Sequence, residues 1–157
     1  MFLTSLPGVG PISASVPECC FNPVLLPLTG LVSRDVYLSA QHAVISQNET
    51  LHGCIKEALK MAGVDLDVVM AAPGFMHLLA AAQASPVVAT VPRRIAERYG
   101  PLLGLEVSPL PFALSLPPVN MVWAAHADSD PANAWLRQQV RAVLVDTATS
   151  TGMRADG

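Results

Sequence analysis

Apolar residues recur along the chain in a pattern that predicts strands followed directly by helices. Residues 87–91 form a short apolar run, Pro92 follows at once, and an amphipathic segment continues to Tyr99. A continuous apolar run bounded by proline is typical of a strand covered on both faces. Pro92 suits the first position of the helix, where its missing N–H is not needed. We therefore expect a buried strand over 87–91 and a helix that begins at Pro92.

A second unit of the same kind lies just upstream. Residues 66–70 are mostly apolar and reach Pro73-Gly74 through two alanines, and apolar residues at helical spacing begin at Phe75. Parallel strands need a crossover connection, which is usually helical, so the two units predict part of a doubly wound α/β sheet. Both helix starts then lie at the carboxyl edge of the sheet, where open α/β folds bind ligands.

The remaining segments extend this pattern in both directions. We expect further strands over 18–22, 42–46, 105–108 and 119–123, with helices starting at Ser33, over 51–62 and at Pro131. The stretch 23–32 reads as an extended connector, and the proline-rich residues 109–118 read as a crossing between lobes. Residues 1–17 read as an irregular arm and residues 145–157 as a disordered tail.

Composition limits the classes of function. Hydrophobic residues make up 52% of the 157 residues, but no apolar run is long enough to span a membrane. The net charge of −3 and the lack of a clustered basic face beyond Arg93, Arg94 and Arg98 argue against nucleic-acid binding by this chain alone. A secretory signal begins with a positively charged segment, but the first 17 residues contain no Lys or Arg. We therefore expect a cytoplasmic protein.

No residue pattern predicts a catalytic or metal centre. The three cysteines have neither disulfide nor CxxC spacing, and Cys19 and Cys20, as strand neighbours, are expected to face core and surface. The four histidines lack a metal-binding spacing, and no G-x-S-x-G elbow is present. We expect no cofactor and no enzyme activity. Arg93 and Arg94 are interpreted mainly as a solvated helix face, with contact to a phosphate or to a partner as the alternative.

The order of these elements resembles the effector-binding (substrate-binding) domain at the carboxyl terminus of LysR-type transcriptional regulators. The match runs from about residue 18 to residue 144. It is carried by the segments VATVPRRIA (88–96), LEVSPLPF (105–112), VNMVW (119–123) and DPANAWL (130–136), with HAVIS (42–46) similar to a further strand of the family.

The resemblance implies an incomplete periplasmic-binding-protein type II-like fold. Residues 42–108 correspond to the second lobe and residues 109–144 to the return into the first lobe, with residues 1–17 unmatched. The family's helix-turn-helix has no counterpart, which predicts a truncated or mis-started product that reaches DNA only through the missing domain. The exposed apolar surface of such a piece would include Trp123 and Trp135.

In the resembled family a small organic effector sits between the lobes, and the domains pair as homodimers. Carried over by position, the effector-binding candidates lie at the two helix starts: Ala72, Pro73, Gly74 and Phe75 at one, and Thr90, Val91 and Pro92 at the other. The amides of a helix start favour a carboxylate, and Phe75 suits an aromatic or apolar ligand body. The alternative for these positions is that Phe75 belongs to the core and Thr90 only caps.

Two other functions stay open. One is a stand-alone small-molecule binding module with the solute-binding-protein fold, and the other is a non-functional gene product. The effector, the target promoter and the direction of regulation are not specified by the residues.

Overall fold

A computed structural model describes residues 9–13, 16–28, 30–46, 60, 63, 65–114 and 119–149 of the chain. The chain forms two compact units. One consists of Ser15–Leu116, and the other combines Met1–Ala14 with Pro117–Gly157.

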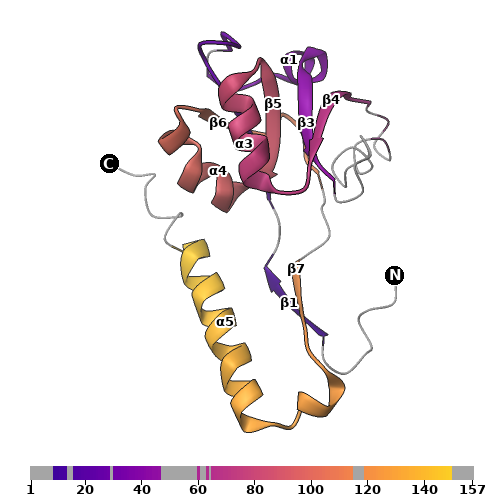
Figure 1. Ribbon diagram of the computed structural model, residues 1–157, viewed down its shortest axis with the longest axis vertical. Helices are drawn as coiled ribbons and strands as arrows, with labels where there is room; N and C mark the ends of the chain where they lie inside the picture. The colour runs from indigo at the N-terminus through magenta and orange to yellow at the C-terminus, as the bar shows by residue number, and fades with distance from the viewer. Residues whose placement is uncertain are drawn as a thin grey trace. The chain divides into compact units, whose positions relative to one another are not determined.

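The unit Ser15–Leu116 is built on a five-stranded mixed sheet with the order β4-β3-β5-β2-β6 (Figure 1). Three of its strands are parallel: β3 (Gln41–Ile45) lies between the edge strand β4 (Asp67–Ala72) and the central strand β5 (Val87–Pro92) and is parallel to both. The strands β2 (Pro17–Phe21) and β6 (Glu106–Pro109) are antiparallel to the strands they pair with. The two predicted strand–helix units are therefore confirmed as parts of one parallel core, in which β3 lies between their strands β4 and β5.

Within the described part of this unit, three helices accompany the sheet. They are α1 (Arg34–Ser39), α3 (Phe75–Ala84) and α4 (Arg93–Tyr99), and a 3-10 turn, η1 (Pro101–Leu103), follows α4. The predicted cap of α1 is present, since the Ser33 hydroxyl accepts the Val36 N–H at 3.4 Å. Figure 1 shows α3 and α4 on one side of the sheet. The predicted helix over 51–62 lies outside the described residues.

Both faces of the sheet are buried. Successive side chains of a strand point to opposite faces, and a separate hydrophobic core packs against each face. One core contains Cys19, Val44 and Val88 and packs beneath α1 and the 110–114 segment. The other contains Cys20 and Ala43, with Leu78 and Leu79 of α3. The expectation that Cys19 and Cys20 divide between core and surface is wrong, since both are fully buried.

The second unit pairs two short strands and carries a long helix. β1 (Val9–Ser13) is antiparallel to β7 (Val119–Val122), and a 3-10 turn, η2 (Ala125–Ala127), precedes α5 (Pro131–Thr149). The Asp130 carboxylate accepts the Ala132 N–H at 3.1 Å, as expected of the residue that caps α5.

Four predicted boundaries need correction. The arm 1–17 is not irregular throughout, because residues 9–13 form β1 and β2 starts at Pro17. The tail does not begin at residue 145, because α5 continues through Thr149. The connector 23–32 is not simply extended, since the Leu25 and Leu26 amides both turn back to the Asn22 carbonyl. Pro92 ends β5 and precedes α4 instead of occupying its first position.

Candidate functional site

The carboxyl ends of β3, β4 and β5 share one edge of the sheet, because the three strands are parallel. The turn from β4 into α3 and the turn from β5 into α4 both leave the sheet at this edge. The predicted common rim for the two helix starts is therefore confirmed.

At the β4–α3 turn the predicted site residues divide between core and surface. The side chain of Ala72 is buried in the core under α3, and Phe75 is half-buried against the same core. Pro73 is exposed, and Gly74 is half-buried with an extended backbone that any residue adopts. Gly74 precedes α3 and offers no side-chain hydrogen bond to its first amides. This turn can therefore present backbone N–H groups to a ligand.

At the β5–α4 turn the side chains of two predicted residues point into the protein. Val91 is fully buried, and Thr90 is 2% exposed with its hydroxyl 2.8 Å from that of Tyr37. Thr90 therefore neither caps α4 nor presents its hydroxyl at the surface. Pro92 is half-buried and stands opposite Pro17 in the β2–β5 ladder.

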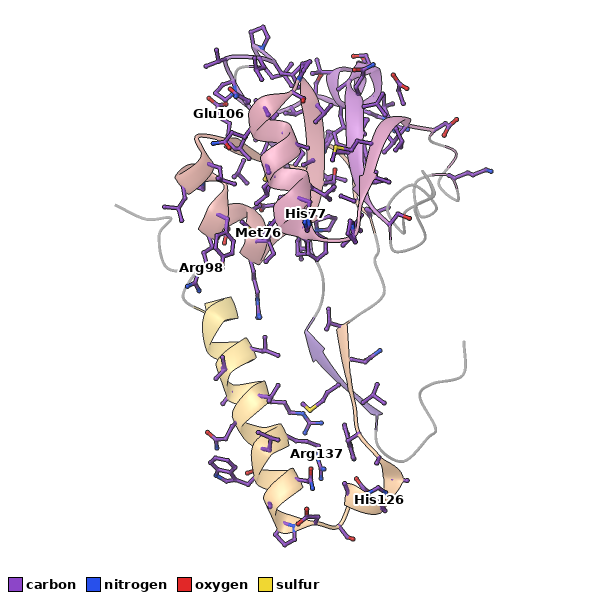
Figure 2. All side chains as sticks on the ribbon, viewed as in Figure 1. Met76, His77, Arg98, Glu106, His126 and Arg137 are labelled. Atoms are coloured by element: carbon purple, nitrogen blue, oxygen red, sulfur yellow. The ribbon has the colours of Figure 1, made fainter. Side chains whose placement is uncertain are left out.

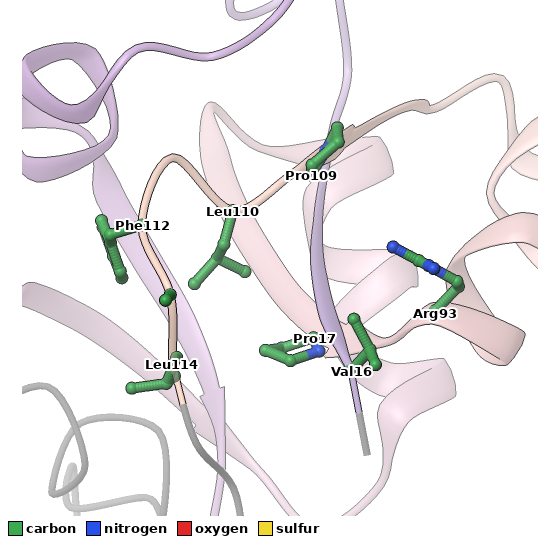
Figure 3. A pocket seen from close by; sticks show the side chains of 8 residues that line it. Val16, Pro17, Arg93, Pro109, Leu110, Phe112 and Leu114 are labelled. Atoms are coloured by element: carbon green, nitrogen blue, oxygen red, sulfur yellow. The ribbon is translucent and has the colours of Figure 1, made fainter. Parts of the chain in front are cut away.

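A groove of about 600 Å³ lies within this unit next to the β5–α4 turn (Figure 3). Its lining includes Val16 and Pro17 at the start of β2, and Arg93 at the start of α4 contributes its charged side chain. Further lining residues follow β6, namely Pro109, Leu110, Phe112, Ala113 and Leu114. The lining combines apolar side chains with one cation, a composition suited to a small organic molecule that carries an anionic group.

None of the seven predicted site residues lines this groove. Pro92 comes closest, because its ladder partner Pro17 and its chain neighbour Arg93 are both lining residues. The lining residues 109–114 were not predicted as ligand contacts, because the sequence marks 109–118 as a crossing segment and 105–112 as part of the family resemblance. The signal that could have found them is the alternation of proline with Leu110, Phe112 and Leu114 directly after a strand end.

Arg93 is held in place by two contacts to the same end of β2. Its backbone N–H donates to the Val16 carbonyl at 2.8 Å, and its Nε donates to Oε1 of Glu18 at 2.6 Å. The Glu18 side chain is 7% exposed, whereas that of Arg93 is 44% exposed. The prediction that Arg93 belongs to a solvated helix face is therefore wrong in part, because its guanidinium neutralises a buried carboxylate.

Beneath the groove, Phe112 connects to a buried polar cluster. The centroids of the Phe112 and Tyr37 rings are 5.4 Å apart in an edge-on arrangement, and the centroids of the Tyr37 and His42 rings are 4.5 Å apart. His42 Nε2 lies 2.8 Å from the Tyr37 carbonyl oxygen, while Nδ1 has no hydrogen-bond partner among the described residues. Burial lowers the pKa of His42 and raises that of Tyr37. The cluster is therefore neutral at physiological pH and supports the groove from below.

The described part of the chain contains no group of three or more His, Cys, Asp or Glu side chains that could hold a metal. Its helices are also too short or too polar to cross a bilayer. His77 and His126 are exposed. Figure 2 labels His77 on the unit Ser15–Leu116 and His126 on the other unit.

Comparison with known proteins gives one consistent family. The model of the LysR substrate binding domain matches residues 26–145. The activator NagR of Ralstonia sp. is 33% identical over 68% of this chain and 36% of its own length, and NahR of Pseudomonas putida is 30% identical over 70% and 37%. The regulatory domain of MexT, a transcriptional activator in Pseudomonas aeruginosa, superposes with a TM-score of 0.72 at 28% identity, covering 85% of this chain and 64% of that domain.

Proposed function

Because the chain belongs to the LysR substrate-binding domain family, we propose that it binds a small organic effector and thereby acts in ligand-responsive transcription. The membership confirms the resemblance and the periplasmic-binding-protein type II-like fold. The relatives are transcriptional regulators, not enzymes. The chain spans little more than a third of the length of NagR and NahR, so the activity of a whole regulator is itself part of the proposal.

The observation that carries the proposal is the shared edge of β4 and β5. The turn at Pro73 and Gly74 and the turn at Pro92 leave the sheet there, and the Pro92 turn adjoins the groove that Arg93 and Phe112 line. We propose that the effector occupies this edge, with Phe75 and the backbone amides of the α3 start as further contacts. An effector with a carboxylate and an aromatic or apolar body fits these groups best.

The remaining assignments follow from the family. Domains of this family bind small effectors and oligomerise. We propose that this chain can form a homodimer in the cytoplasm, and that DNA is reached only through a helix-turn-helix domain outside the chain. The predicted second lobe, residues 42–108, falls within the unit Ser15–Leu116.

Titration calorimetry of the full chain with a panel of small aromatic acids and their neutral amides tests effector binding. Gly74→Asp would place a carboxylate at the start of α3, where it caps the helix and repels an anion, so we expect acids to bind about tenfold more weakly. Gly74→Asn is the matched control, because it caps without the charge. A panel in which no acid or amide binds would contradict the proposal.

Light scattering coupled to size exclusion tests the homodimer separately. A mass of twice that of the 157-residue chain is expected at high protein concentration. A monomer at every concentration would remove the dimer from the proposal without affecting effector binding.

A further inference from the structure

We propose that Arg93 is the group that recognises the effector's carboxylate, and that Glu18 sets both the position of the guanidinium and the strength of its charge. This inference rests on the proposed function and adds a specificity-determining residue outside the seven positions predicted from the sequence. Four observations support it: the place of Arg93 in the groove, the geometry of its ion pair, the charges of its neighbours and the apolar side chains that share the groove.

The place of Arg93 follows from the ladder between β2 and β5. Pro17 pairs with Pro92 and Glu18 pairs with Val91, so the residue after Pro92 reaches the start of β2, where it bonds to the Val16 carbonyl. Among the groove-lining residues Arg93 is the single charged side chain. A ligand in the groove therefore meets one cation at a fixed position.

The geometry of the ion pair leaves most of the guanidinium available. A guanidinium has five N–H donors, and Glu18 engages the one on Nε. Among the described residues no other partner of the Arg93 side chain is found, so both Nη groups remain for a ligand. Two neighbouring N–H groups match the two oxygens of a carboxylate in a bidentate contact, which Lys could not reproduce.

Glu18 has two opposing effects on an incoming anion. Its nearly buried carboxylate fixes Arg93 through a 2.6 Å contact, which reduces the entropy lost on binding. Its negative charge also offsets that of Arg93, which weakens the attraction for an anion. Neutralising Glu18 while keeping its oxygen acceptor should therefore tighten the binding of a carboxylate.

The apolar side chains complete the specificity. In the view of Figure 3, Arg93 lies on one side of Val16 and Pro17, while Leu110, Phe112 and Leu114 lie on the other. A ligand that spans the start of β2 would place its carboxylate at Arg93 and its ring against these side chains. The expected ligand class is thus a small aromatic or alicyclic monocarboxylate.

The test measures the affinity of benzoate and of its neutral isostere benzamide for four forms of the full chain. Glu18→Gln should bind benzoate about twofold to fivefold more tightly than the wild type, because one repulsive charge is removed. The double variant E18Q/R93Q keeps an amide pair in place of the ion pair and should bind benzoate about tenfold more weakly. Arg94→Gln, which alters a neighbouring arginine outside the groove lining, should bind as the wild type does.

Benzamide separates recognition of charge from loss of structure. Its affinity should be the same in all four forms, since it presents the same ring without the anion. The inference is overturned if benzoate binds the wild type and E18Q/R93Q equally, if benzamide loses affinity in parallel with benzoate, or if the wild type does not bind benzoate. The proposed function fails separately, when no member of the wider panel binds.

Discussion

The hydroxyl oxygen of Tyr37 on α1 lies 2.8 Å from the hydroxyl oxygen of Thr90 on β5, and both side chains are buried. This pair joins α1 to β5, the central strand of the five-stranded sheet. It also explains why Thr90, although it stands near the end of a strand that leads to the candidate site, cannot offer its hydroxyl to an effector without losing an internal partner. The role of Thr90 is therefore structural, and effector contacts at this turn are expected from Pro92 and Arg93.

The Tyr37–Thr90 pair should reveal itself in a double-mutant cycle. Tyr37→Phe and Thr90→Val each leave one buried hydroxyl unpaired, so each should lower the free energy of unfolding by about 1 kcal/mol. The double variant should be less destabilised than the sum of the two, because neither hydroxyl then remains. Urea unfolding provides the measurement. Strictly additive losses would contradict a direct bond between the two side chains.

His42 predicts a loss of stability in mild acid. Burial lowers its pKa, opposed by the hydrogen bond to the Tyr37 carbonyl and by the charge of Asp67, so the unfolded chain takes up a proton more readily than the folded one. Unfolding free energy should thus fall as the pH drops below about 6.5, with a slope of at most about 1.4 kcal/mol per pH unit for this one group. Below the pKa of His42 in the folded state, both states carry the proton, so this group causes no further loss of unfolding free energy.

Urea unfolding at a series of pH values measures this effect. His42→Gln keeps a donor near the Tyr37 carbonyl and should flatten the profile. The matched control is His77→Gln, which alters an exposed histidine of the same unit and should leave the acid-side slope unchanged. The same slope in wild type and His42→Gln would show that another group causes the acid sensitivity.

Cys19 and Cys20 should be unreactive in the folded protein. Burial raises the pKa of the Cys19 thiol to about 11 and that of the Cys20 thiol to about 12, so little of the reactive thiolate exists near neutral pH. In a Cys54→Ser background, a thiol reagent such as iodoacetamide should label these cysteines only as fast as the protein unfolds, and at once in denaturant. Rapid labelling under native conditions would show that this part of the sheet opens locally.

The parallel core could be predicted because its signals are local. Residues 87–91 combine an apolar run with a proline stop, and Phe75 begins a helical period directly after Pro73-Gly74. Each pattern is complete within one strand–helix unit, and the physical need for a crossover then fixes the parallel direction. Sequence order alone was therefore enough to bring the two turns to one edge.

The features that escaped prediction depend on partners distant in the sequence. β1 contains Gly10 and Pro11, which are poor strand formers, and becomes a strand through pairing with β7 near the other end of the chain. The Arg93–Glu18 pair likewise depends on β2 lying beside β5. A single sequence without aligned relatives carries no signal for either contact, so the groove and its cation had to come from the structure.

Two glycines near α4 should respond differently to the same substitutions, because they are constrained for different physical reasons. A Cβ on Gly100 would lie 2.6 Å from the Ala96 carbonyl oxygen and 2.8 Å from Cγ2 of Val107, so Gly100→Ala should cost about 1–3 kcal/mol through overpacking. Gly104 has open space but a φ of +68°, so Gly104→Ala should cost about 1 kcal/mol through backbone strain.

Asparagine distinguishes the two causes. It tolerates the left-handed backbone and should restore most of the stability at Gly104, but at Gly100 it is larger than alanine and should do worse. Because Gly100 ends the short helix that starts with Arg93, its alanine variant should also weaken carboxylate binding, whereas Gly104→Asn should not. Thermal unfolding and benzoate titration measure both effects, and equal behaviour of asparagine at the two positions would contradict this explanation.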